Sequence, residues 1–110
     1  MSPTLTAALA TVEREGPLTP SALAEHERIR RPTATRVVTR LEAAGLVTRT
    51  GDPSDHRVAH VAITPTGRAL LNRIRSRKNE YLAQRLRDLG PADRATLAQA
   101  TAVLERLLES

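Results

Sequence analysis

The segment from Thr19 to Gly45 constrains the fold of this 110-residue chain more than any other. It predicts two short helices joined by a basic turn. Thr19 can cap the first helix with proline next to it, and Pro32 starts the second. Apolar residues of the second helix fall on one side, so a core can hold that side while Thr and Arg side chains face outward. The apolar set is Ala34, Val37, Val38, Leu41 and Ala44.

A β-hairpin is expected directly after this helix pair. Residues 46–50 and 58–64 read as two strands, and the turn-forming residues 51–55 lie between them. In the second strand, Val61 and Ile63 alternate with His60 and Ala62, as in a half-buried strand. Two helices followed by a hairpin predict a winged helix-turn-helix.

Three more helices complete the predicted fold. The first runs to about Glu15, with apolar residues at Leu5, Ala8, Leu9 and Val12. Thr64-Pro65 is again a cap followed by proline and opens a long helix that runs to about Leu89, and Gly90-Pro91 separates this helix from the last one. We therefore expect a mostly α protein with a small β-hairpin, in which residues 1–64 form the winged helix-turn-helix and residues 65–110 form a helical dimerisation segment.

The composition favours self-association. There is no Phe or Trp, and Tyr81 is the one aromatic residue, so the core rests on smaller aliphatic side chains. The last helix carries a seam at spacings of four, three and four residues, which suits contact between helices. The expected dimerisation residues are Leu97, Thr101, Leu104 and Leu108.

The chain has no Cys and no long apolar run. The first fact excludes thiol sensing, disulfides and Cys-based zinc sites. The second leaves no segment of the ~18 apolar residues that a membrane helix needs. We expect a cytoplasmic protein that binds neither a membrane nor a cofactor.

Positive charge is concentrated on the predicted helix pair and hairpin. The formal net charge is +5, and residues 28–60 carry seven arginines against three acidic residues. A cationic helix face of this kind can enter the major groove of DNA, where arginine pairs with guanine or holds phosphate. We expect Arg36, Arg40 and threonines of this helix to read or position bases. Arg31 and Arg49 would hold the DNA backbone.

The hairpin adds an arginine at its tip. Arg57 can probe a narrow minor groove, and Asp55, two residues earlier, can orient the guanidinium. A salt bridge without function is the alternative. The candidate DNA-binding residues are Arg31, Thr33, Thr35, Arg36, Thr39, Arg40, Arg49, Asp55 and Arg57.

Metal binding and catalysis find little support in the sequence. His56 and His60 are four residues apart on an extended strand, roughly 13 Å from one another, so they cannot share an ion without help from another element. Ser54, Asp55 and His56 are contiguous, whereas a catalytic triad converges from separate places. We expect neither a metal site nor an enzyme.

Two other functions remain open at this level. The helix-turn-helix could be the scaffold of a protein-interaction module without specific DNA readout. The chain could also be a non-specific architectural DNA binder. Salt dependence separates DNA binding from an apolar protein interface, because phosphate contacts weaken steeply with added salt.

The chain resembles the MarR (multiple antibiotic resistance regulator) family of bacterial winged helix-turn-helix regulators. The matching residues include Ala44-Gly45-Leu46-Val47 with Arg49, the run Asp52-Pro53-Ser54-Asp55-His56-Arg57, and Val61-Ala62-Ile63-Thr64 with Gly67. The resemblance covers residues 5 to 89 well and the last helix loosely. Relative to the family pattern, this chain starts almost directly on the second family helix.

The resemblance implies a transcriptional repressor that binds a near-palindromic operator as a homodimer. The two reading helices would enter successive major grooves about 34 Å apart, with Arg57 of each wing in the flanking minor groove. Dimerisation would use the long helix and the Leu97–Leu108 seam alone, or would be weak. The family also implies a small-molecule effector that changes the spacing of the reading helices; its identity is not specified by this sequence.

Overall fold

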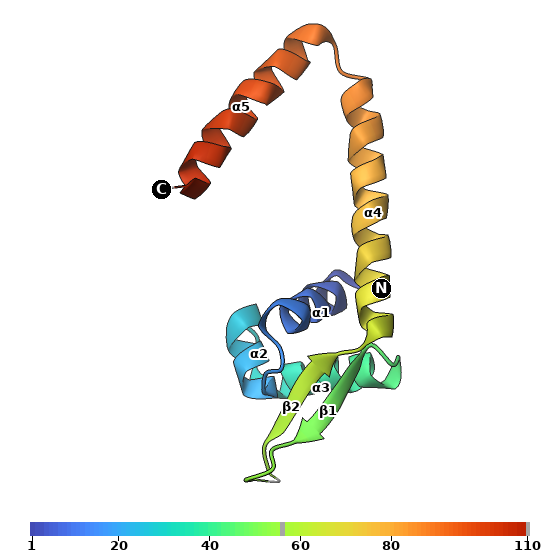
Figure 1. Cartoon of the computed structure of the whole chain (residues 1–110), viewed down its shortest axis with the longest axis vertical. Helices are drawn as coiled ribbons and strands as arrows, with labels where there is room; N and C mark the ends of the chain where they lie inside the picture. The colour runs from blue at the N-terminus through green and yellow to red at the C-terminus, as the bar shows by residue number, and fades with distance from the viewer. Residues whose placement is uncertain (56, 110) are drawn as a thin grey trace. The chain divides into compact units, whose positions relative to one another are not determined.

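The computed structural model describes residues 1–55 and 57–109 (Figure 1). They form five helices and one two-stranded antiparallel sheet, in agreement with the predicted winged helix-turn-helix. The elements in chain order are α1 (Pro3–Glu15), α2 (Pro20–Glu27), α3 (Arg31–Ala43), β1 (Val47–Gly51), β2 (Ala59–Ile63), α4 (Pro65–Arg87) and α5 (Pro91–Glu109). The chain divides into two compact units, residues 1–74 and 75–110.

Local capping explains where the first two helices begin. The Leu5 N–H donates to Ser2 Oγ at 3.2 Å, and the Ala22 N–H donates to Thr19 Oγ1 at 3.1 Å. Each cap precedes a proline, whose missing N–H costs nothing in the first turn. The cap predicted at Thr19 is therefore confirmed, and Ser2 caps α1 in the same way.

The turn on each side of α3 uses a left-handed residue. Arg28 ends α2 with φ +54°, and Gly45 follows α3 with φ +74°. A residue without Cβ adopts this region at no steric cost, so Gly45 suits the turn that ends α3. Ala44, expected on the buried stripe, is exposed because it caps the helix instead of continuing its inner face.

The core of the first unit collects residues from every helix in it and from both strands. α3 contributes Ala34, Val37, Val38 and Leu41, as predicted. Leu71 of α4 is 2% exposed and belongs to the same cluster, so the first turns of α4 pack with the winged helix. This packing explains why the compact unit extends to residue 74 and not to the start of α4.

The hairpin is joined to the helical part of the first unit through backbone hydrogen bonds. Its register pairs Val47 with Ile63 and Arg49 with Val61. Val61 also exchanges two backbone hydrogen bonds with Leu18, at 2.8 and 3.1 Å, which join β2 to the connection between α1 and α2. The hairpin base is thus part of the core, while residues 51–55, 57 and 58 extend from it. We call β1, β2 and residues 51–58 the wing.

The start of α4 is bonded to the end of α3. The Thr64 hydroxyl donates to the Gly45 carbonyl at 2.7 Å and accepts the Gly67 N–H at 3.0 Å. Gly67 lies so close to this turn that an added Cβ would meet the Leu46 carbonyl oxygen and Ile63 Cγ1. The N-cap predicted at Thr64 is confirmed, and the same hydroxyl connects the start of α4 to the residue that follows the C-cap of α3.

The second unit contains the rest of α4 and the whole of α5. Every residue of α5 from 91 to 109 is exposed. Among residues 1–55 and 57–109, no helix combines the length and the apolar character needed to cross a lipid bilayer.

Candidate nucleic-acid interface

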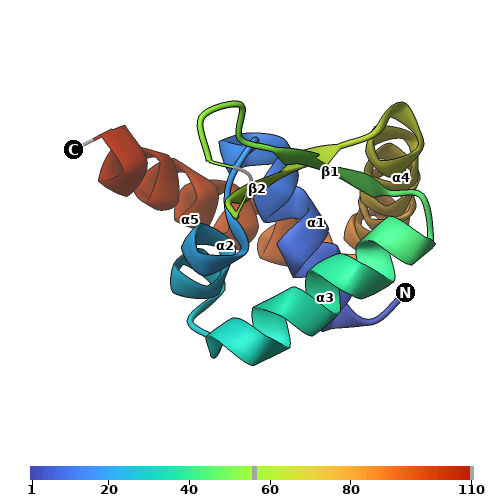
Figure 2. The same cartoon turned by 90° about the horizontal axis from the view of Figure 1, so that it is seen from below.

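The outer side of α3 is polar and uncovered. Val37 and Val38 are buried, whereas the neighbouring residues of the helix point away from the core. Figure 2 shows α3 and the hairpin beside one another on one side of the first unit. The exposed residues that we call the reading face are Thr35, Arg36, Thr39 and Arg40.

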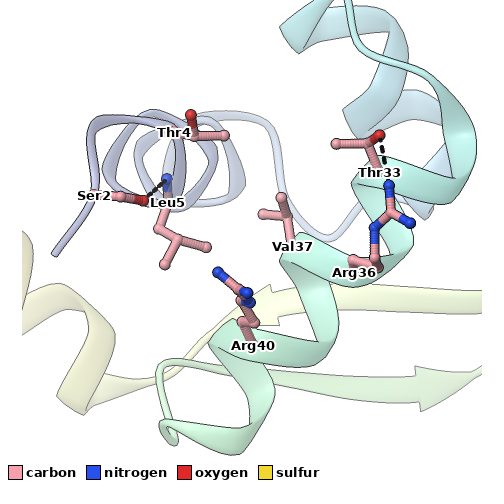
Figure 3. A pocket seen from close by; sticks show the side chains of 7 residues that line it. All are labelled: Ser2, Thr4, Leu5, Thr33, Arg36, Val37 and Arg40. Carbon is pink, nitrogen blue, oxygen red and sulfur yellow. Dashed lines mark hydrogen bonds between the residues drawn. The ribbon is translucent and has the colours of Figure 1, made fainter.

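The two arginines of the reading face lie on its α1 side. Arg36 Nη2 donates to Thr33 Oγ1 at 3.3 Å, and the guanidinium of Arg40 is directed into the hollow beside Leu5 (Figure 3). This cavity has a volume of about 320 Å³ and is open to solvent. Among residues 1–55 and 57–109, neither arginine forms an ion pair, so both cations are available for an anionic partner.

The two threonines of the reading face bond back into their own helix. Thr35 Oγ1 donates to the Arg31 carbonyl at 3.1 Å, and Thr39 Oγ1 donates to the Thr35 carbonyl at 2.9 Å. Such bonds to the carbonyl four residues earlier are the usual local option for threonine in a helix. They fix where the hydroxyl proton points before any DNA arrives.

Arg49 reaches from β1 onto α3. Its Nη2 donates to Thr39 Oγ1 at 2.8 Å, and its Nε lies 3.4 Å from Glu42 Oε1, an ion pair without hydrogen-bond geometry. The side chain is 30% exposed. The expected contact between Arg49 and DNA backbone stays a prediction; within the described chain, Arg49 joins the wing to the reading helix.

The tip of the wing presents Arg57. Its side chain is 92% exposed, and both its backbone N–H and its Nε donate to Asp55 Oδ1, at 3.0 and 3.2 Å. The predicted pairing of these two residues is therefore present. Ser54 donates its hydroxyl and its backbone N–H to Asp52 Oδ1, and these bonds, the hydroxyl first, lower the pKa of Asp52.

The interface combines a reading face and a cationic wing tip on one unit. Arg31 adds an exposed cation at the first residue of α3, and the half-buried Thr33 holds Arg36. A cationic helix face next to a projecting arginine can bind a duplex through phosphates and base edges together. The sequence predicts this combination of a cationic helix face and a cationic hairpin tip, and the structure adds the contacts that each side chain makes.

Comparison with known proteins decides the family. The model of the MarR family matches residues 1–59. An uncharacterized HTH-type transcriptional regulator of Mycobacterium bovis is 37% identical over 102 residues, which are 93% of this chain and 71% of the relative. The chain belongs to the MarR family.

Solved MarR-type structures share the fold of this family member. The YusO protein from Bacillus subtilis superposes with a TM-score of 0.85 at 25% identity, over 96% of this chain and 75% of that one. A variant of MepR from S. aureus bound to an oligodeoxyribonucleotide superposes with a TM-score of 0.78 at 21% identity, over 97% and 80% of the two chains. The predicted MarR resemblance and winged helix-turn-helix fold are confirmed, and the protein is an HTH-type transcriptional regulator of that family.

The second unit of this MarR-family chain displays apolar side chains. Leu97 and Thr101 of the expected seam line a groove of about 670 Å³ together with Leu86 and other residues of α4 and α5. Leu104 and Leu108 are 59% and 87% exposed. Further exposed apolar residues of these helices were not predicted, although their i, i+4 spacing indicates them: Leu82, Leu86, Val103 and Leu107.

The histidines do not converge in the part of the chain that the structure describes. There, no group of three or more His, Asp or Glu side chains is placed to hold a metal ion. His60 lies on β2. His56, the other histidine weighed as a ligand, lies outside the described residues.

Proposed function

We propose that this MarR-family regulator represses transcription by binding a near-palindromic operator as a homodimer. One observation carries the proposal: α3, with its exposed arginines, and the wing, with the exposed Arg57, are both visible from the same side of the first unit (Figure 2). α3 would enter the major groove, and Arg57 would enter the flanking minor groove. An occupied promoter then excludes RNA polymerase sterically.

The reading helix α3 and the wing would contact different parts of the duplex. Arg36 and Arg40 stand one helical turn apart, which suits contacts to adjacent base pairs or phosphates. Arg31 at the start of α3 would meet backbone, and Asp55 would keep Arg57 extended from the turn. Arg49 would contribute through its hold on α3 and through phosphate.

The apolar face of the second unit supports the homodimer. A contiguous exposed apolar surface on a small protein marks an interface, because its exposure to water costs free energy. A second copy would cover the groove beside Leu97 and the exposed Leu104 and Leu108. Twofold symmetry of the protein then matches a near-palindromic operator.

Control by a small molecule completes the proposal. An effector would release DNA by binding more tightly to a dimer whose reading helices are wrongly spaced for the operator, since a ligand shifts an equilibrium only through differential affinity.

The test begins with selection of bound duplexes from random or genomic fragments, followed by footprinting and anisotropy titration. We expect a footprint with twofold symmetry and an affinity that falls about 10³-fold or more between 50 and 200 mM salt. Equal affinity for the selected and a scrambled duplex would contradict specific readout and indicate an architectural binder. Salt-independent binding would favour a protein-interaction module.

A charge-matched pair of variants locates the interface. Arg40→Ala removes a cation from the reading face, and Arg68→Ala removes one from α4, where Arg68 Nη1 lies 3.9 Å from Glu13 Oε2. Operator affinity should fall in the first variant and stay near wild type in the second. Equal losses would show that net charge alone governs binding.

A further inference from the structure

The hydroxyl group of Thr39 is already occupied on both its donor and its acceptor side. A threonine hydroxyl has one proton to donate and two lone pairs. The proton goes to the Thr35 carbonyl at 2.9 Å, and one lone pair accepts Arg49 Nη2 at 2.8 Å. One lone pair and the methyl group remain for an incoming base.

This arrangement restricts which base edge Thr39 can recognise. Thymine O4, adenine N7 and both guanine acceptors need a donor, and the Thr39 proton is committed elsewhere. Adenine and cytosine amino groups need an acceptor, but the Arg49 cation 2.8 Å from the oxygen weakens it and repels a second N–H. Neither kind of hydrogen bond is favoured.

The methyl group of Thr39 is the part of this side chain that remains available to contact a base. The 5-methyl group of thymine is the apolar feature of the major groove, and a threonine methyl is among the groups that pack on it. Thr39 is exposed on the reading face, at a position of α3 opposite the buried Val37 and Leu41. Its methyl can therefore reach a base edge without any change in the core.

We propose that Thr39 is a specificity-determining residue that recognises thymine through methyl–methyl contact, with Arg49 as the residue that holds its hydroxyl turned away from the bases. The inference rests on the proposed DNA-binding function and adds the chemistry of its readout. Thr35, which donates its own hydroxyl proton to the Arg31 carbonyl, presents a second methyl group one turn earlier. The reading face thus selects thymine at Thr39 and guanine or phosphate at its arginines.

The experiment replaces each operator thymine by uracil, one position at a time, in one half-site. Uracil lacks only the 5-methyl group and pairs in the same way. We expect wild type to lose about fourfold in affinity at the thymine opposite Thr39, the factor that corresponds to burial of one methyl group. Thr39→Ser keeps the hydroxyl and loses the methyl, so it should bind the thymine and uracil duplexes equally at that position.

Two further variants separate this role from a structural one. Thr39→Val keeps the shape and the methyl and should retain the preference for thymine. Thr96→Ser is the matched control, because Thr96 Oγ1 makes the same bond to the Ala92 carbonyl, at 3.0 Å, on α5; it should behave as wild type.

Either of two results overturns the inference while the proposed function stands. In the first, wild type binds the operator specifically but does not distinguish uracil from thymine at any position. In the second, Thr39→Ser keeps the full preference or Thr39→Val loses it, which would assign readout to the hydroxyl. Absence of any preferred duplex would overturn the proposed function and this inference together.

Discussion

Arg57→Ala should separate DNA affinity from fold stability. The Arg57 side chain is 92% exposed and pairs with Asp55, itself 41% exposed. An exposed pair of this kind contributes about 0–1 kcal/mol to folding. The urea midpoint of the variant should therefore stay close to that of wild type, and the wing should keep its backbone turn.

The loss of operator affinity should be much larger. An arginine that contacts bases contributes about 1–3 kcal/mol, and a dimer has two wings, so the variant should lose about 2–6 kcal/mol of binding free energy. The lower value corresponds to roughly 30-fold in the dissociation constant. If the two guanidinium groups also neutralise phosphate charge, the slope of log K against log salt should become shallower by about 2.

Fluorescence anisotropy with a labelled operator, repeated at several salt concentrations, measures both quantities. Arg68→Ala serves as the control, because it removes the same charge from a side chain that faces Glu13 of α1. Unchanged operator affinity in Arg57→Ala at matched salt would remove the wing from the mechanism. A parallel loss in both variants would reduce the effect to net charge.

Three further predictions concern the links around the interface. Thr64→Val should lower the free energy of unfolding by about 1–3 kcal/mol in urea titration, because it removes an N-cap and the hydrogen bond to Gly45. Thr64→Ser keeps the hydroxyl and should be close to wild type; equal stability of the two variants would refute this role of Thr64. Leu104→Glu should halve the mass measured by sedimentation, because it places a charge in the apolar face of the second unit. Gln99→Glu adds the same charge on the other side of α5 and should leave the dimer intact. A Leu104→Glu variant that is still dimeric would exclude this face as the dimer interface. The pKa of Asp52 is lowered chiefly by the Ser54 hydroxyl, so the hydrogen bonds of the turn should be stable at pH values above 3.8, the ordinary aspartate pKa, and should be lost as the pH falls through the lowered pKa. The Ser54 amide resonance should follow this titration in wild type and not in Asp52→Asn.

Much of the fold was predictable because its signals are local. Thr19 and Thr64 each bond to an N–H three residues later, so a cap followed by proline specifies a helix start without reference to the rest of the chain. The stripe of Ala34, Val37 and Leu41 follows from helical spacing alone. The expected strands differ from the observed ones by one residue at each end, because turn-forming residues mark a strand end only to within a residue or two.

Other features were not predictable because they join residues far apart in the chain. Leu71 completes the core of the first unit although its helix reads as a separate segment. Ala44 continues the apolar spacing of α3 yet is exposed, because the chain leaves the helix there. The spacing of apolar residues along a helix does not show at which residue the helix ends and its side chains leave the core.

The amino-acid sequence by itself determined the order of helices and strands, the side of each helix that is buried, and the cationic residues available to DNA. These properties depend on hydrogen bonds and periodicity within a few residues. Only the tertiary structure decided that Arg49 bonds to Thr39 and that Thr64 holds the end of α3. Those contacts exist because packing brings β1 and the start of α4 against α3, and packing depends on the whole core at once.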